Sequence, residues 1–230
     1  MKNRFFVMAA IVASSFIQVA YAHHGLDFVT VETVHLPLKG AGYAIARLDY
    51  ISEEEYELEF EPSILYGATD WFAIELHAHF EKEEGESTKY ESLAPAMRIR
   101  LTPREQPFSV GLSVEYEFAH DSDEDDVVGL NAIIGYEISG WMFAANLLHE
   151  KPSHSSGEWA YAAGVRHAYN DDHGFGLEFN GSLENSDSSE VLIGYYGELS
   201  NQFSINAGFG TGLGDGPDWS VRTAFIWNFR

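Results

Sequence analysis

Acidic and large apolar side chains alternate along several short stretches of the chain. The run Tyr-Glu-Leu-Glu-Phe-Glu at 56–61 is the clearest case, and residues 72–80, 108–118 and 175–180 repeat the pattern. Successive side chains of a β-strand point to opposite faces, so these runs gather polar groups on one face and aromatic rings on the other. The acidic face would attract cations, and the aromatic face suits apolar surroundings.

The polar face is where we expect the function of the chain to lie. Charges taken out of water are costly unless they are paired or hydrated. A filling of Glu–Arg ion pairs would satisfy this condition, and so would a water-filled pore whose acidic wall favours cations. Carboxylates outnumber guanidinium groups, and the pore is the preferred interpretation. The charged residues that the alternation places inward are Arg47, Asp49, Glu57, Glu59, Glu61, Glu75, Glu81, Arg98, Arg100, Glu115, Glu117, Glu137, Arg166, Glu178, Glu198 and Arg222.

Histidines are the candidate metal ligands. Cleavage after Ala22 would expose His23 as a new N-terminus followed by His24, and a free amine with imidazoles is a suitable ligand set for Cu(II). His77 and His79 lie two residues apart, so one strand face can present both. The alternative to metal binding is that His23 and His24 are adjacent by chance, and that His77 and His79 are polar side chains of the lumen. Copper or another divalent cation is the only cofactor considered.

Two acidic loops have a weaker resemblance to cation sites. Asp121, Asp123 and Asp125 have the spacing of calcium ligands, but Asp126 and Ala132 stand where the motif needs Gly and Glu. Weak binding of divalent cations at the lipopolysaccharide surface is the expectation for residues 81–86 and 121–126.

One loop combines serine and histidine, the residue types of a hydrolase. Ser153, His154 and Ser155 are adjacent, with Glu150 and Glu158 nearby. Neighbours in a loop do not form a nucleophile–base–orienter set, and no family signature surrounds them. A polar loop is therefore the preferred interpretation, and we expect no enzyme.

Glycines alternate near the end of the chain, which leaves one face of a strand and the next loop bare. Either the segment 23–40 packs against this bare wall, or the wall bends strongly there, and bending is preferred. No helix follows, so a nucleotide-binding loop is excluded. The glycines are Gly208, Gly210, Gly212, Gly214 and Gly216.

The elements that must position these groups are β-strands. From Gly42 onward the chain divides into about twelve alternating runs of roughly ten residues, the length of a tilted membrane strand. A helix would instead space its apolar residues three to four apart. The predicted strands are Gly42–Ile51, Tyr56–Tyr66, Trp71–Phe80, Lys89–Leu101, Phe108–Ala119, Val127–Ile138, Trp141–His149, Trp159–Tyr169, Phe175–Leu183, Glu190–Leu199, Phe203–Leu213 and Trp219–Phe229.

The connections between these strands fall into two classes. Those that follow even-numbered strands are short, and those that follow odd-numbered strands are mostly longer or more acidic. Short periplasmic turns opposite longer external loops are typical of outer-membrane barrels. A soluble β-sandwich also alternates, but it does not explain the two loop classes or the strand number.

The start of the chain predicts export. Lys2 and Arg4 precede an apolar stretch at 5–19 and an Ala-Tyr-Ala site at 20–22, so residues 1–22 are predicted to be a signal peptide, with a retained membrane anchor as the alternative. Residues 23–41 would form a periplasmic tail, an extra edge or a lumenal segment, and residues 42–230 the barrel. Cysteine is absent, which excludes a disulfide-stapled scaffold. The net charge of −23 excludes nucleic acid as a partner.

The last strand carries the family resemblance. Its outer face is Trp219, Val221, Thr223, Phe225, Trp227 and Phe229, and its inner face includes Arg222. This terminal aromatic strand, with the signal peptide and the strand–turn rhythm, resembles small Gram-negative outer-membrane barrels, and most nearly the transporter-like group linked to phenol-degradation pathways. Arg230 departs from the family pattern, because such chains usually end in the aromatic residue.

The resemblance implies an antiparallel up-and-down barrel in the outer membrane. Membrane lipid, lipopolysaccharide, the barrel-insertion machinery and a small solute are the implied partners. Together with the acidic inner face, it predicts passive passage of a small cationic or neutral solute. The alternatives are a closed barrel with a copper-handling or structural role and, more distantly, an outer-membrane hydrolase.

Overall fold

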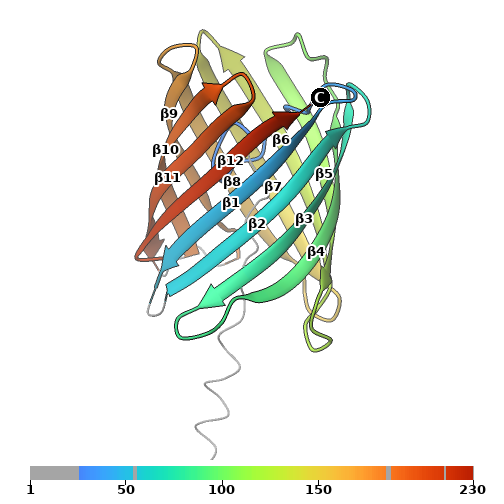
Figure 1. The fold of residues 1–230 in the computed structure, drawn as a ribbon, viewed down its shortest axis with the longest axis vertical. Coiled ribbons are helices and arrows are strands. Elements are labelled where there is room, and N and C mark those ends of the chain that lie inside the picture. The colour runs from blue at the N-terminus through green and yellow to red at the C-terminus, as the bar shows by residue number, and fades with distance from the viewer. Residues whose placement is uncertain (1–25, 54–55, 185–187, 215, 230) are drawn as a thin grey trace, which may run out of the picture.

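The chain folds into a closed barrel of twelve antiparallel strands in the computed structural model (Figure 1). The structure describes residues 26–53, 56–184, 188–214 and 216–229, and within them no helix is long and apolar enough to cross a membrane. The strands are β1 (Gly42–Ser52), β2 (Tyr56–Gly67), β3 (Phe72–Glu83), β4 (Lys89–Arg100), β5 (Phe108–Ala119), β6 (Val127–Ile138), β7 (Trp141–Pro152), β8 (Glu158–Ala168), β9 (His173–Ser182), β10 (Ser188–Ser200), β11 (Phe203–Gly214) and β12 (Trp219–Phe229).

The alternating sequence determines both the strands and their faces. All twelve predicted runs form strands, and their ends differ from the predicted ends by at most three residues. In β12, Val221, Phe225 and Trp227 lie on the outside, whereas Arg222 is buried inside. The predicted all-β, up-and-down barrel is therefore confirmed.

Pairing between the first and last strands closes the barrel. Each strand pairs with its neighbours in sequence, and β1 pairs with β12 over its whole length, from Gly42 opposite Phe229 to Ser52 opposite Trp219. Closure satisfies the backbone hydrogen bonds of both edges, as an apolar bilayer requires. Asp49 lies opposite Arg222 in this register, so the seam also brings opposite charges together inside.

The two ends of the barrel differ in their connections, as predicted. One end, here called the short-turn end, holds the connections 68–71, 101–107, 139–140, 169–172 and 201–202. At the tightest of these, Ser139 and Gly140 both have positive φ, at 49° and 81°. Such a pair matches the twist of a two-residue hairpin. The other end, the long-loop end, includes the acidic connections 84–88 and 120–126.

Aromatic side chains gather on the outer surface near both ends. Phe203 and Trp227 stack at the short-turn end with ring centroids 6.2 Å apart. Tyr50 and Trp219 stack near the other end at 5.0 Å. Exposed aliphatic side chains, such as Ile64, lie along the strands between them. An apolar band between two aromatic girdles is the surface of a membrane barrel.

The residues before β1 lie inside the barrel. This inner segment, residues 26–41, contacts β11 and β8 at its start and reaches Gly67 of β2 at its end, all near the short-turn end. Its blue trace is visible within the barrel in Figure 1. Of the three positions considered for this region, the structure has the lumenal one.

Candidate functional site

The middle of the inner segment closes the lumen. Phe28, Thr30, Val31 and Glu32 have no exposed surface. Every strand contributes a buried residue to the surrounding wall, and we call this layer the waist. In order from β1 to β12, examples are Arg47, Leu65, Glu75, Arg98, Ser113, Asn131, Asn146, Ala162, Glu178, Leu192, Asn206 and Arg222. At the waist, ion pairs and a chain segment therefore fill the lumen, whereas the sequence analysis preferred an open acidic pore.

Glu178 of β9 anchors one side of the segment. Its carboxylate accepts hydrogen bonds from the backbone N–H groups of Val29, Thr30 and Val31, at 2.7, 2.6 and 3.1 Å. The Thr30 hydroxyl donates a fourth bond at 2.7 Å, and the Tyr196 hydroxyl a fifth, also at 2.7 Å. Hydrogen bonds to an ionised group are about twice as strong as neutral ones, so these donors compensate the burial of the carboxylate.

Glu32 of the segment binds to the opposite side of the wall. Arg98 lies 3.2 Å from one carboxylate oxygen. Ser113 and Asn131 donate to the other oxygen at 3.0 and 2.6 Å. Arg98 also pairs with Glu75 at 2.6 Å. A buried carboxylate is stable only with such partners, and strands β4, β5 and β6 each supply one.

A second charge network crosses the seam of the barrel. Asp49 accepts from both Arg47 and Arg222, each at 2.5 Å. Arg222 also binds Glu190 at 3.0 Å, and Ser220 donates a short hydrogen bond to that same carboxylate. Because β1 and β12 are the ends of the chain, this network holds together strands that are farthest apart in sequence.

Ion pairs also join the two arms of the inner segment. His35 lies 2.7 Å from Asp27 on the entering arm and 2.9 Å from Glu137 of β6. Arg166 of β8 lies 3.5 Å from Asp27. Asp27 raises the pKa of His35 to about 10, against the opposing effect of burial. Burial alone would raise the pKa of Asp27, but His35 and Arg166 hold it well below its ordinary value.

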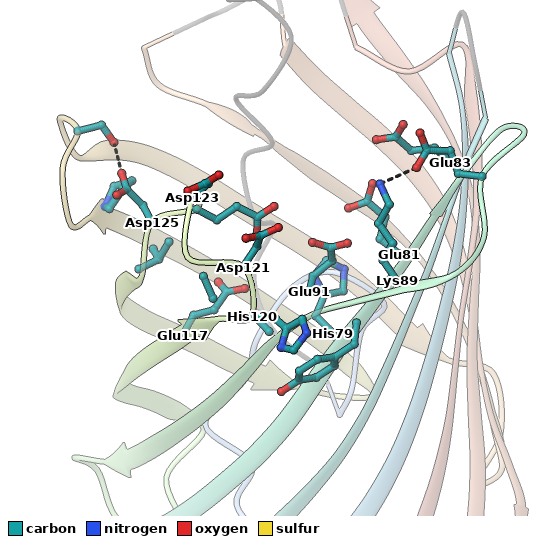
Figure 2. Close-up of a pocket in the computed structure, with 18 residues that line it drawn as sticks. His79, Glu81, Glu83, Lys89, Glu91, Glu117, His120, Asp121, Asp123 and Asp125 are labelled. Atoms are coloured by element: carbon teal, nitrogen blue, oxygen red, sulfur yellow. Dashed lines mark hydrogen bonds and ion pairs between the residues drawn. The ribbon is translucent and has the colours of Figure 1, made fainter.

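An acidic vestibule lies at the long-loop end. This cavity of about 1070 Å³ is lined by the ends of β3 to β7 and the loops between them. Figure 2 shows Glu81, Glu91, Glu117 and Asp121 around it. Lys89 and Glu86, which form an ion pair, also line the cavity. The residues 81–86 and 121–126, considered above for divalent cations, contribute to this lining.

The predicted inward charges occupy three levels of the lumen. The residues buried at the waist are Arg47, Asp49, Glu75, Arg98, Glu115, Glu178 and Arg222. Arg100 is also buried and lies closer to the short-turn end. Glu57, Glu59, Glu61, Glu81 and Glu117 are half-buried toward the vestibule. Arg166, Glu137 and Glu198 lie toward the short-turn end, where Arg166 is half-buried and the two glutamates are exposed.

The structure describes two of the four predicted metal ligands, His77 and His79. His77 hydrogen-bonds Glu115 at 2.6 Å inside the waist, whereas His79 lines the vestibule. His23 and His24 lie outside the described residues, as does the signal peptide. Within the described ranges no group of three or more metal-binding side chains forms. Copper binding at the N-terminus stays a sequence prediction.

The serine loop forms hydrogen bonds with a neighbouring loop. The Ser153 hydroxyl donates to the Asp126 carbonyl at 2.8 Å, and the Ser155 hydroxyl to the Asp125 carboxylate at 3.5 Å. The ring of His154 also bonds Asp125, and this contact contributes to a lowered pKa of that aspartate. These bonds tie together two loops at the long-loop end.

Four glycines admit the inner segment: Gly67 faces its backbone at Pro37 and Leu38, and three others face its side chains. A Cβ added at Gly208 would lie 3.3 Å from Val29, so the segment does pack against one member of the alternating glycines. A Cβ at Gly164 would lie 2.7 Å from Phe28, and one at Gly111 2.4 Å from Val34. At Gly210 the neighbours are Glu190 and Ser220 instead. The glycine face of β11 therefore makes room for the inner segment at Gly208 and for wall side chains at Gly210.

Several site residues escaped the sequence analysis. Glu32, Asp27 and His35 precede the strands, where alternation gives no information. Glu190 lies an even number of residues from Glu198 on β10, so the alternation that placed Glu198 inward could also have identified Glu190. The waist asparagines, such as Asn131, alternate correctly but are uncharged, so a search for charges omitted them.

Comparison by sequence finds no matching family model and no matching curated protein. By structure, the chain is similar to a crystal structure of an outer-membrane channel from Pseudomonas putida F1, with a TM-score of 0.69, 10% identity, and coverage of 85% of this chain and 97% of that one. The KdgM porin gives a TM-score of 0.59 at 7% identity, with 82% of this chain and 98% of that one covered. The NanC porin gives a TM-score of 0.59 at 10% identity, with 81% and 99% covered. At these identities the likeness shows the shared fold of small outer-membrane barrels.

Proposed function

We propose that this protein is a passive channel for small polar solutes in the outer membrane of a Gram-negative bacterium. The observation that carries the proposal is the large number of buried charged and amide side chains in the lumen of a barrel with an apolar exterior. Such a wall is costly unless it binds water, ions or solute. The similarity in fold to an outer-membrane channel and two porins supports the same function.

The acidic vestibule supports a cationic or neutral solute, as the sequence suggested. Carboxylates around a cavity with protein walls raise the local concentration of cations and repel anions. The inner segment then controls passage, because solute cannot cross the waist until residues 28–32 move. The segment is continuous with the barrel only at Gly42, so it can shift without breaking a strand pair.

Single-channel recording in planar bilayers tests the proposal. The refolded full-length protein should give discrete conductance steps, and a salt gradient should show preference for K⁺ over Cl⁻. Absence of steps would contradict the channel. A strong anion preference would contradict the solute charge.

A reversible crosslink tests the role of the inner segment. Val29→Cys with Gly208→Cys places two thiols on facing positions, since the Val29 Cγ atoms lie 3.3 and 3.6 Å from a Cβ at Gly208. The native chain has no cysteine, so this would be the only disulfide. The oxidised variant should show no conductance and should conduct after reduction, whereas the conductance of either single-cysteine variant should not change on reduction. Equal conductance before and after reduction would show that the segment does not gate.

A further inference from the structure

The wall holds the inner segment mainly through its main chain. Glu178 accepts from three successive N–H groups, at residues 29, 30 and 31. Asn146 accepts from the N–H of Glu32 at 2.7 Å and donates to its carbonyl at 2.9 Å. Main-chain groups are common to all peptides, so these contacts do not depend on the sequence of the segment. Further carbonyls, of residues 26, 27, 28, 34, 36 and 37, accept from Asn206, Arg166, Arg100 and Arg104.

Two side chains of the segment enter built pockets. The Glu32 carboxylate is held by Arg98, Ser113 and Asn131, all of them buried. Phe28 packs edge-on against Tyr196, with ring centroids 5.7 Å apart, in the apolar cluster of the waist. One pocket therefore selects a carboxylate, and the other accepts an apolar group.

The wall can exist without the segment. Arg98 would keep its 2.6 Å pair with Glu75, and Glu178 its 2.7 Å bond from Tyr196. The polar part of the surface left behind could bind water, whereas exposing the apolar wall residues, such as Met142 and Leu192, would cost about 25 cal/mol for each Å². The partners that Arg98 and Glu178 keep are those that a site for a displaceable ligand would need.

We propose that the waist is a binding site for short peptides that carry a carboxylate, and that residues 28–32 are its resident ligand. Such a solute presents N–H donors to Glu178 and a carboxylate to Arg98, as the segment does. This inference rests on the proposed channel function and names its solute class. A zwitterionic peptide has no net charge, so it also tolerates the acidic vestibule.

The site can be emptied in the folded protein. A specific protease sequence inserted between Leu38 and Lys39, both exposed, lets the segment be severed after the barrel has formed. Mild urea then washes the severed piece away, and heat-modifiable migration on gels checks that the barrel stays folded. The probe is a fluorescent synthetic peptide with the sequence of residues 26–38, and its binding is followed by anisotropy.

Three results are expected. The severed protein binds the probe saturably, and the uncut protein does not. A probe with Glu32→Gln binds about tenfold more weakly, the loss of about 1.4 kcal/mol that a charged hydrogen-bond partner accounts for. Unlabelled Val-Thr-Val-Glu with an amidated C-terminus, the sequence of residues 29–32 without net charge, displaces the probe, and the amidated Val-Thr-Val-Gln does so less well.

Variants of the barrel wall test whether the carboxylate pocket accounts for the difference in affinity between the Glu and Gln probes. Arg98→Gln should bring the affinities for the Glu and Gln probes within about twofold, because the two changes remove one interaction. Arg47→Gln removes an equally buried guanidinium that does not contact Glu32, and it should keep the full difference. If Arg98→Gln does not fold, Ser113→Ala replaces it, since it removes only a 3.0 Å hydrogen bond.

Several outcomes would overturn the inference. These are equal binding of native and scrambled probes, equal binding of the Glu and Gln probes, failure of the tetrapeptide to displace, or retention of the severed piece without exchange. Binding is measured without ion flow. Conductance without peptide binding would therefore overturn only this inference, and peptide binding without conductance would overturn only the channel.

Discussion

Single residues at the waist act as partners of buried charges. Asp49, Arg222 and Glu190 are each almost fully buried, and they are stabilised by one another and by Arg47, Ser220 and Asn180. Removing one member leaves an uncompensated charge in a medium of low dielectric constant. The loss then exceeds the net contribution of the pair itself.

Arg222→Gln should therefore lower the free energy of unfolding by about 3–5 kcal/mol, the usual cost of breaking a buried pair. Urea titration of the protein in phospholipid vesicles, followed by tryptophan fluorescence, measures the change. Arg104→Gln is the matched control, because Arg104 lies in a turn and donates to the backbone carbonyls of Asp70, Leu36 and Pro37. A loss at position 222 no larger than at position 104 would contradict the network.

His35 should make stability depend on alkaline pH. Its folded pKa is raised to about 10 from an unfolded value of 6.5, so the stabilisation is complete below pH 6.5 and is lost as the pH rises toward 10. The Tm of the wild type should fall over this range, and His35→Gln should flatten the profile. Circular dichroism melts from pH 6 to 10 test this. Parallel profiles for the two proteins would show that the pairs with Asp27 and Glu137 do not stabilise the fold.

At the scale of elements, glycines in the strands decide whether the inner segment fits. The atoms nearest to a Cβ at Gly164 of β8 belong to side chains of that segment, Phe28 at 2.7 Å and Val31 at 3.2 Å. A Cβ at Gly129 of β6 would find only the Cβ of Glu115 at 3.6 Å, an ordinary contact. The two glycines share a strand environment but differ in what faces them.

Gly164→Val should therefore push the inner segment from the waist and increase the open probability of the channel. Gly129→Val, which adds the same side chain away from the segment, should behave like the wild type. Single-channel recording of both variants under identical voltage gives the comparison. Unchanged gating in Gly164→Val, with the barrel folded, would show that the segment adjusts within the waist without opening it.

At the scale of the whole molecule, the proposed channel has two selective regions in series, the vestibule and the waist. In this proposal the vestibule sets the sign of charge that enters, because many carboxylates surround one cavity. The waist would then determine which solutes pass, through specific hydrogen bonds. A barrel of twelve strands encloses enough space for both, whereas smaller barrels are filled by side chains alone.

Charge at the vestibule should control ion selectivity. Glu117→Gln with Asp121→Asn should reduce the preference for K⁺, measured as the reversal potential in a KCl gradient. Glu105→Gln with Asp171→Asn removes the same charge at the short-turn end and should have a smaller effect. The difference should disappear near 1 M salt, where the screening length is about 3 Å. Equal shifts from the two pairs would show that net charge, rather than the vestibule, sets selectivity.

The sequence by itself determined the barrel, because alternation is a local property of each strand. Trp219 to Phe229 already shows which side chains face outward, and strand number, loop classes and inward charges follow from the same period of two. The alternation alone assigned Arg47, Asp49 and Arg222 to the inner face, where the structure has them. Their pairing was not predicted, since it depends on the register that closes β1 on β12.

Only the tertiary structure decided what fills the lumen. Residues 26–41 lack a repeating pattern, so nothing local distinguishes a tail from a plug. Their position follows from contacts with residues 99 to 149 positions away, such as Val29 with Glu178 and Glu32 with Asn131 and Asn146. Glu32 and Glu178 are both acidic, and the same charge leads one to bind an arginine and the other to bind backbone N–H groups. Parity specifies the face of a side chain, but only the assembled barrel specifies its partner.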